Sequence, residues 1–336
     1  SQIALYNIFE GLTRISEAGA VGPGLATSWT ADAARKVYTF KLLSGVKFSD
    51  GTTFDSADVK FTYERNAGEK STNKRKKRFI NMASVEAPDA TTVKITLKNA
   101  NPNLAFEMGE STAVIVGPES AAGNETNPVG TGPYKVSKWV RGDSVTLVKQ
   151  DHYRDAGSIK LSKVTFKFMS DPSAQMAALR AGDIDFFPYF GSPESVDQFK
   201  ADKDFEVLEG TTEGEVILST NNKSPIMSDV RVRQAVAYAI DRQAIVDGAM
   251  FGFGTPIGSH MAPHNPAYVD LTGAFAYNPA KAKALLKEAG HGNGVTVSLK
   301  LPPPAYARRG GEIIAAQLAK VGITATIEPV EWAQWL

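Results

Sequence analysis

The chain has 336 residues, 43% of them hydrophobic and 22% charged, and its formal net charge is +1 at pH 7. This is the composition of a globular protein long enough for two domains, and the near-neutral charge excludes a bulk electrostatic attraction to nucleic acid or to an anionic membrane. The absence of cysteine excludes disulfides, thiolate metal sites and a cysteine nucleophile, and it is compatible with export.

The sequence contains neither a run of 18 apolar residues nor a signal peptide, so we expect no membrane-spanning helix. The first residues, SQIALYNIFEGL, are apolar at helical intervals, and residues 3–12 predict a short helix. The last residues, EWAQWL, have a helical pattern without a stop signal. We therefore expect further chain on both sides of this sequence.

Strands and one capped helix are predicted in the next hundred residues. Residues 36–43 alternate between apolar and polar side chains, and so do residues 93–97, which is the pattern of half-buried strands. A helix between these strands is predicted to begin at Ser56 or Asp58 and to run through Tyr63.

Two segments suggest anion binding at first sight. Residues 74–78 (KRKKR) read as a solvated basic loop, but the same charges would attract an anionic solute if the run faced a ligand cleft, and both interpretations stay open. The turn at residues 127–134 is rich in glycine and proline. It lacks both the Gly-Lys-Ser/Thr ending of a phosphate loop and the G-x-G-x-x-G spacing of a dinucleotide site.

Strands are predicted at residues 144–149 and 164–169, followed by a capped helix at residues 171–179. Asp183 and Asp185 come next and would suit a carboxylate pair for acid–base catalysis. Because they lie where a helix ends and a strand starts, a structural role is favoured.

Residues 207–220 are predicted to form a strand that leads into an extended connector, residues 221–226. Ser228 or Asp229 then caps a helix that has one apolar face. A long β-rich run precedes this stretch and a new strand-and-helix unit follows it, so it marks a crossing between two lobes. The apolar face consists of Val232, Ala235, Val236, Ala239 and Ile240.

The loop at residues 255–267 contains two histidines, His260 and His264. Four residues apart on a helix they would suit a metal ion. The prolines around them argue against a helix, and no third ligand is evident. The sequence therefore predicts no metal site.

The last third of the chain reads as alternating helices and strands. Asn278 caps a helix with Pro279 at its first position, and Gly290 provides the C-terminal stop. The elements predicted after it are a strand at 295–301, a helix at 312–321 and a strand at 323–327.

Residues 302–311 (PPPAYARRGG) connect that strand to that helix, at the kind of position where open α/β sheets bind ligands. Helix N-terminal amides favour anions, and Arg308 and Arg309 add fixed charge with bidentate geometry. Two cations near a helix start interact unfavourably with the macrodipole. Their presence there therefore favours a binding role. The alternative of two arginines on a solvated first turn stays open.

Several segments carry a family resemblance. The longest is residues 24–65, GLATSWTADAARKVYTFKLLSGVKFSDGTTFDSADVKFTYER, followed by residues 221–242, NNKSPIMSDVRVRQAVAYAIDR. Shorter ones are GTGPY at 130–134, AGDID at 181–185 and YNPAKAKALLKEAG at 277–290. Together they resemble the family 5 extracellular solute-binding proteins, the dipeptide- and oligopeptide-binding components of ABC importers.

The resemblance implies an α/β, two-lobed periplasmic binding protein fold of type II, peptide-binding-protein-like, with an inserted subdomain in lobe I. The hinge is expected near residues 219–228, with Asn221 and Pro225 as hinge residues. The expected parts are residues 1–9 and 129–220 for lobe I, 10–128 for the inserted subdomain and 221–336 for an incomplete lobe II.

The resemblance also implies which side chains face the solute. Glu213 and Glu215 fall where family members often carry ligand-facing residues, and a buried glutamate there would pair with a ligand amine. Two exposed carboxylates on a strand edge are the alternative. Family members place a ligand contact within residues 302–311, so Tyr306, Arg308 and Arg309 are candidates to bind a solute carboxylate. We expect no catalytic residue, no metal and no cofactor.

The implied function is the substrate-binding component of an ABC importer, which closes over a peptide or similar small solute and delivers it to membrane permease subunits. We expect a monomer that binds no nucleic acid and is periplasmic, or extracellular and membrane-anchored in a Gram-positive host. The solute is open among peptides, nickel, haem, oligosaccharides, opines and other small molecules. The alternatives are a two-lobed α/β hydrolase or transferase, disfavoured because G-x-S-x-G and H-E-x-x-H are absent, and a peptide sensor or chaperone on the same fold.

Overall fold

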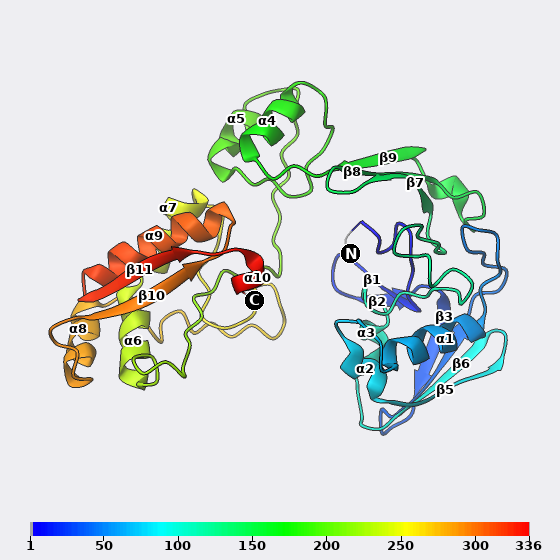
Figure 1. The fold of residues 1–336 in the computed structure, drawn as a ribbon, viewed down its shortest axis with the longest axis horizontal. Coiled ribbons are helices and arrows are strands. Elements are labelled where there is room, and N and C mark those ends of the chain that lie inside the picture. The colour runs from blue at the N-terminus through cyan, green and yellow to red at the C-terminus, as the bar shows by residue number, and fades with distance from the viewer. Residues whose placement is uncertain (1–2, 336) are drawn as a thin grey trace. The chain divides into compact units, whose positions relative to one another are not determined.

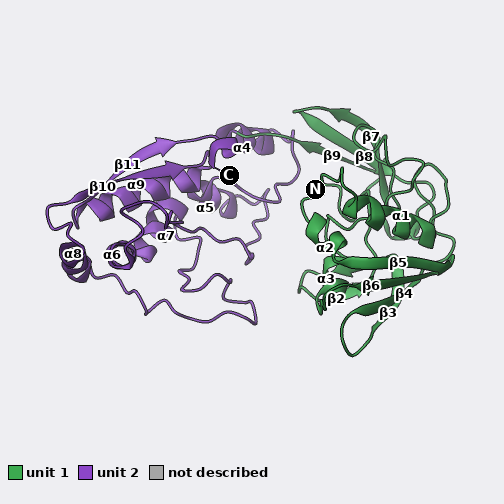
Figure 2. Cartoon of the chain, turned by 60° about the horizontal axis from the view of Figure 1, so that its bottom comes forward, with its two compact units in different colours: residues 1–170 green, residues 171–336 purple. Residues whose placement is uncertain are grey.

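The computed structural model describes residues 3–335. The chain divides into two compact units, residues 1–170 and residues 171–336 (Figure 2). Each unit mixes helices and strands and has a buried core of its own, which agrees with the expected α/β class. The lobe and hinge boundaries expected from the sequence rest on the family resemblance, whereas these two units are defined by compactness. The lobe boundaries therefore stay predictions.

The first unit is built around a four-stranded antiparallel sheet in the order β3-β4-β6-β5 (Figure 1). Its inward side chains, among them Tyr38, Phe40 and Ile95, join a single core with Val59 and Tyr63 of helix α1. The predicted strands at 36–43 and 93–97 are confirmed as β4 and β6. The bounds are β3 Ala26–Ala31, β4 Val37–Leu42, α1 Ser56–Ala67, β5 Met82–Asp89 and β6 Thr92–Leu97.

A second sheet in this unit contains three antiparallel strands in the order β7-β8-β9. Ile8 packs on its buried residues Val145 and Leu147. The predicted strands at 144–149 and 164–169 are confirmed as β8 and β9. The remaining bounds are β1 Thr13–Ile15, β2 Val21–Pro23, α2 Lys76–Ile80, α3 Leu104–Glu107, β7 Tyr134–Val140, β8 Ser144–Lys149, a 3-10 turn Ala156–Ser158 and β9 Lys163–Lys167.

The helix predicted over residues 3–12 does not form, and this segment consists of turns. Tyr6 has a positive φ of 61°, which an α-helix does not allow. Its hydroxyl donates to the carbonyl of Gly109 at 2.7 Å and accepts from the amide of Ile15 at 2.8 Å. These distant bonds hold the segment in turns, and its apolar intervals reflect packing against the unit rather than a helix face.

The second unit contains a parallel pair of strands, β10 and β11, joined by helix α9 (Figure 1). Helices α6 and α8 pack together and share a core with residues of α9 and β11. The bounds are α4 Pro172–Arg180, a 3-10 turn Pro193–Ser195, α5 Val196–Lys200, α6 Val230–Ala239, α7 Arg242–Met250, α8 Pro279–Glu288, β10 Val295–Leu301, α9 Ala305–Ala319, β11 Ile323–Pro329 and α10 Trp332–Trp335.

Helix starts follow the predicted caps. Asp171, Asp229 and Asn278 each accept a hydrogen bond from a backbone amide in the first turn, at 2.7, 2.8 and 3.0 Å respectively. Helix α1 begins at Ser56 as predicted, but its cap is Asp55, and Asp58 completes a reciprocal capping box.

Three further predictions are wrong in the second unit. Residues 207–220 form no strand, because they have no hydrogen-bonded partner strand among residues 3–335. The connector at 221–226 is folded into turns rather than extended. Helix α9 begins at Ala305, seven residues before the predicted start, because packing holds Gly310 and Gly311 in the helix despite their low helix propensity.

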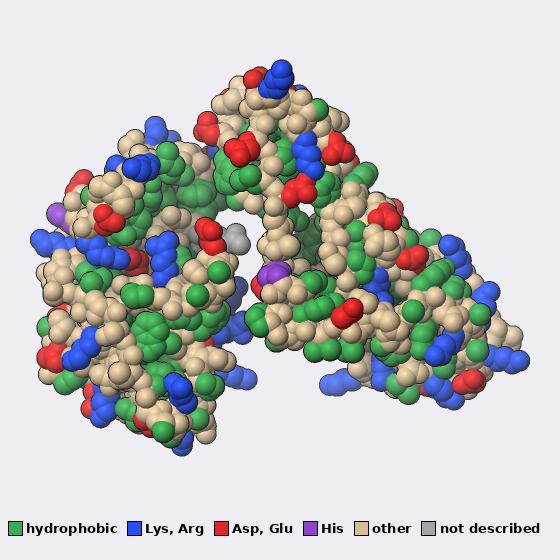
Figure 3. Space-filling model, turned by 180° about the vertical axis from the view of Figure 1, so that it is seen from behind, with side chains coloured by type: hydrophobic (Ala, Val, Ile, Leu, Met, Phe, Trp, Pro, Cys, Tyr) green, Lys and Arg blue, Asp and Glu red, His purple; other side chains and the backbone are tan. Residues whose placement is uncertain are grey.

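No helix in the described part of the chain combines the length and the apolar character needed to cross a bilayer. Acidic and basic side chains are interspersed over the face shown in Figure 3, in keeping with the net charge of +1.

Candidate functional site

Arg309 lies in the second turn of α9 and is already bound by a carboxylate of the same unit. Its Nη1 and Nη2 donate to Oε2 and Oε1 of Glu194 at 3.0 and 2.9 Å. Its guanidinium also lies 5.4 Å from the ring centre of Phe251. The hydrogen bond from Arg309 lowers the pKa of Glu194, so the pair is charged at neutral pH. The end-on face of the Arg309 guanidinium, formed by Nη1 and Nη2, is therefore already occupied by a carboxylate.

Arg308, one residue earlier, has no carboxylate partner in the described part of the chain. It is exposed and makes no ion pair with any carboxylate of residues 3–335. Tyr306 is half-buried in the first turn of the same helix. Helix α9 has no side-chain cap at Pro304, and only the backbone carbonyl of Pro304 accepts at this end, from the amides of Ala307 and Arg308. Arg308 and Tyr306 are thus the available pair of the three residues predicted in this segment.

Glu213 contacts the loop at 255–267. Its Oε1 lies 2.9 Å from Nε2 of His264, and its Oε2 accepts from Nδ2 of Asn265 at 3.2 Å. Glu215 makes a parallel contact, because its Oε2 lies 3.3 Å from Nδ1 of His260. The structure therefore brings together two sets of residues that the sequence presented separately, and it gives each glutamate a histidine partner.

These histidine–carboxylate pairs attach one irregular segment to another. The two glutamates do not lie at the end of a strand, because the predicted strand is absent. No group of three metal-ligating side chains converges anywhere in residues 3–335, this loop included. The arrangement can hold the loop or accept a cationic group of a solute, since both carboxylates keep solvent-exposed surface.

A pocket of about 400 Å³ opens beside the Arg309–Glu194 pair. Three carboxylates line it, from Glu194, Asp197 and Asp247, together with the rings of Phe251 and Phe253. Such a lining repels anions, so this pocket does not suit the carboxylate-bearing solute expected from the sequence. Glu194 was missed in the sequence because nothing local relates it to a helix 115 residues further on.

The predicted hinge residues lie in consecutive turns. Asn221 accepts from the amide of Lys223 through its side chain at 3.1 Å and from the amide of Ser224 through its carbonyl at 2.9 Å. The carbonyl of Pro225 accepts from the hydroxyl of Ser228 at 2.9 Å. These bonds are all local, so they can re-form in another conformation of the segment.

Asp183 and Asp185, considered above as a carboxylate pair, lie where helix α4 ends. The amide of Asp183 donates to the carbonyl of Ala178 at 2.9 Å, and Gly182 has a φ of 76°, so these residues form the C-terminal stop of α4. Asp185 lies two residues later, in the irregular segment that follows α4.

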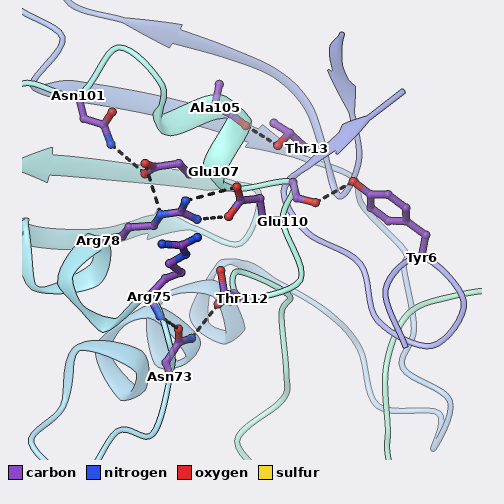
Figure 4. A network of polar contacts seen from close by, with 11 residues as sticks. Tyr6, Thr13, Asn73, Arg75, Arg78, Asn101, Ala105, Glu107, Glu110 and Thr112 are labelled. Carbon is purple, nitrogen blue, oxygen red and sulfur yellow. Dashed lines mark hydrogen bonds and ion pairs between the residues drawn. The ribbon is translucent and has the colours of Figure 1, made fainter. Parts of the chain in front are cut away.

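The basic run at 74–78 is only partly a loop, because helix α2 begins at Lys76. Arg78 points inward and pairs with Glu107 at 3.4 Å and with Glu110 (Figure 4). Lys74 and Arg75 lie in the turn before α2 and are exposed. One member of the run is therefore a structural ion pair, and the others keep their charge at the surface.

Residues 20–336 match the family model described as bacterial extracellular solute-binding proteins, family 5. The glutathione-binding protein GsiB of Escherichia coli K12 is 31% identical over 342 residues, which are 99% of this chain and 66% of GsiB. The chain thus spans just under two thirds of the length of this relative.

Two solved structures are similar across almost the whole chain. The binding protein AgaA of A. tumefaciens R10, in complex with agropinic acid, shares 32% identity and a TM-score of 0.82 over 98% of this chain and 68% of its own. The periplasmic binding protein DppA of Helicobacter pylori, in complex with the peptide STSA, shares 26% identity and a TM-score of 0.85 over 98% and 69%. The expected two-lobed periplasmic binding protein fold is confirmed by these neighbours.

Proposed function

Because the chain belongs to the bacterial extracellular solute-binding proteins, family 5, we propose that its protein is the substrate-binding component of an ABC importer. The observation that carries this proposal is the family match over residues 20–336, together with a chain-wide likeness to a periplasmic protein associated with an ABC transporter. In this function a solute is captured and handed to permease subunits, and no bond in the solute is made or broken.

The solute class is supported by chemistry that the named relatives share. Glutathione, agropinic acid and the peptide STSA all carry at least one carboxylate, and all three are small. Arg308 supplies an unpaired guanidinium near a helix start that has no side-chain cap, which suits a carboxylate. We therefore assign a carboxylate-bearing peptide or peptide-like solute, with Arg308 and Tyr306 as its contacts in the second unit.

Glu213 and Glu215 are the complementary candidates. Each keeps exposed carboxylate surface beside its histidine, and an ammonium group of a solute could take the place of the imidazole and form a charge-assisted hydrogen bond with the carboxylate. A solute with an amine and a carboxylate, such as a peptide, would use both kinds of contact.

Closure by a hinge is part of the same proposal. Residues 1–9 with 129–220 would form lobe I, 10–128 its inserted subdomain and 221–336 part of lobe II, with the movement absorbed near Asn221 and Pro225. The local turns at this connector support that role, because their bonds span only a few residues. The family description, extracellular solute-binding proteins, supports a protein that works outside the cytoplasm. We propose that it acts there as a monomer on membrane permease subunits.

The test is native mass spectrometry of the full-length mature protein, first under mild and then under denaturing conditions. A ladder of masses that resolves into short peptides would support a peptide importer. One discrete small mass would support a dedicated solute. If the released molecules are products of a reaction that the protein completes on added peptide, the assignment as a binding protein would be wrong.

A further inference from the structure

A second pocket, of about 230 Å³, lies in the first unit and outside every residue assigned above to solute binding. Its walls are helix α1, the turn at residues 71–75 and the segment at residues 111–116. It is lined by two cations and by hydroxyl and amide groups, and no carboxylate lines it. The residues that matter here are Thr62, Arg65, Asn66, Asn73, Lys74 and Thr112.

Two side chains fix the walls relative to one another. The hydroxyl of Thr62 donates to the carbonyl of Val116 at 2.9 Å and accepts from its amide at 3.1 Å. The Nδ2 of Asn73 donates to the carbonyl of Thr112 at 2.8 Å, while its Oδ1 accepts from the amide of Arg75 (Figure 4). The pocket is therefore preformed, and a ligand would not have to order it.

One polar side chain in this rigid frame is available to a ligand. Asn66 is only 9% exposed, and its side chain makes no hydrogen bond within the described range, residues 3–335. Buried polar groups are almost always paired, so an unpaired amide that lines a pocket points to a ligand with acceptor atoms. The hydroxyl of Thr112 also has no protein partner in that range, but it is fully buried, so a ligand in the pocket does not reach it.

The charges around the pocket are also uncompensated. Neither Arg65 nor Lys74 forms an ion pair within the part of the chain that the structure describes, and both are exposed. Two acidic side chains of neighbouring segments have other partners, since Glu110 binds Arg78 and Glu64 lies 3.9 Å from Lys60. The pocket therefore has a net positive lining.

We propose that this pocket binds a small oxyanion, a phosphate or carboxylate group, through Arg65, Lys74 and Asn66. The volume suits a group of this size rather than a whole peptide. Arg65 and Asn66 lie in the last turn of α1, where helix carbonyls oppose an anion, so binding depends on the two cations. The basic run at 74–78 thus contributes Lys74 to a defined site.

The test is calorimetric titration of the full-length protein with sodium phosphate and, separately, with sodium acetate, at constant ionic strength in chloride. Saturable binding of either anion at one site supports the proposal. If neither anion gives a heat of binding beyond that of the chloride control, and neither raises Tm above that control, the proposal is overturned.

The variant that addresses the pocket is Arg65→Ala with Lys74→Ala, and we expect it to weaken anion binding at least tenfold. The matched control is Lys70→Ala with Lys77→Ala, which removes the same charge from exposed neighbours that do not line the pocket. The control should change the affinity less than twofold. Equal weakening in both double variants would show general surface charge and would overturn the site.

A third variant keeps the proposal testable if the charge changes disturb folding. Asn66→Asp keeps the shape of the side chain but puts a carboxylate into the pocket, and it should abolish anion binding. Its near-wild-type circular dichroism would show that the fold is kept. Undiminished binding in this folded variant would contradict the role of Asn66 and of the pocket.

Discussion

Arg154 and Glu10 form a bidentate ion pair between segments that are 144 residues apart, with Nη1–Oε2 and Nη2–Oε1 distances of 2.8 and 2.7 Å. Glu10 is 7% exposed, so its carboxylate is largely shielded from water and depends on Arg154 to balance its charge. The bonds to Glu10 raise the pKa of Arg154. The pair therefore ties the N-terminal turns to the loop after β8 in the first unit.

We expect Arg154→Ala to lower the free energy of unfolding by about 3 kcal/mol, because it leaves a buried carboxylate without its partner. The measurement is urea unfolding of the full-length protein followed by circular dichroism. Lys135→Ala is the matched control. It breaks the exposed 2.7 Å pair with Asp151, and it should cost less than about 1 kcal/mol. Equal losses in the two variants would show that burial of Glu10 adds nothing.

Asp58 gives a pH dependence. Burial raises its pKa from 3.8 to about 6, and the nearby carboxylates of Asp55 and Glu119 act in the same direction. The folded state thus holds this proton more tightly than the unfolded chain does. Stability from this group is present below pH 4 and is lost as the pH rises through about 6.

In the wild type the amide of Asp55 donates to the carboxylate of Asp58 at 2.8 Å. Asp58→Asn removes the titration but keeps an acceptor for this amide. Between pH 4 and pH 7 we expect the wild type to lose about 2–3 kcal/mol of unfolding free energy relative to the variant. Urea unfolding at a series of pH values measures this difference. A difference that stays constant between those pH values would refute the raised pKa.

Local signals in the sequence predicted the parts of the fold that depend on near neighbours. Asp171, Asp229 and Asn278 cap helices through bonds that span two or three residues, so the sequence pattern contains the whole interaction. Strands β4 and β6 were predicted because alternation reflects a single buried face. The long match of residues 24–65 to a known family gave the fold itself, which no local pattern establishes.

What the sequence could not give depends on distant contacts. The turns at 3–12 are held by Tyr6 through a partner 103 residues away. The same holds at the candidate site, where Glu194 occupies Arg309 and His264 approaches Glu213 across loops. Two arginines in sequence looked equivalent, and only the fold separates the paired one from the free one.

The adjacent glycines of α9 differ in the space around them, and this gives a matched pair of substitutions. A Cβ on Gly311 would lie 2.4 Å from Cδ1 of the buried Leu301, whereas one on Gly310 would lie 3.7 Å from Cγ2 of Ile245 and 4.0 Å from Cβ of Ala249. The first distance is a clash and the others are ordinary contacts. The close approach of α9 to β10 therefore requires only Gly311.

Gly310→Ala should raise the unfolding free energy by about 0.5–1 kcal/mol, because alanine favours the helix and restricts the unfolded chain. Gly311→Ala should lower it by about 1–3 kcal/mol through overpacking. Both values come from the same urea unfolding experiment. Two changes of the same sign and size would mean that α9 does not pack on Leu301 as described.

Arg308 and Arg309 provide the sharpest test of solute recognition. Arg308→Ala removes the free guanidinium and should weaken binding of the carboxylate-bearing solute more than tenfold, or about 1.4 kcal/mol. Arg309→Ala removes the same charge one residue later, but this guanidinium is bound to Glu194, so binding should change less than threefold. Titration calorimetry on the full-length protein, with the solute identified by mass spectrometry, measures both.

The two variants also differ in what else they disturb. Arg309→Ala breaks a partly exposed ion pair and should lower stability by at most about 1 kcal/mol, while Arg308→Ala breaks none in residues 3–335 and should leave stability unchanged. Loss of binding in Arg309→Ala alone would mean that the solute displaces Glu194, and the acidic pocket beside it would then belong to the solute site. Unchanged binding in both variants would remove Arg308 and Arg309 from solute recognition and leave Tyr306, Glu213 and Glu215 as the remaining candidates.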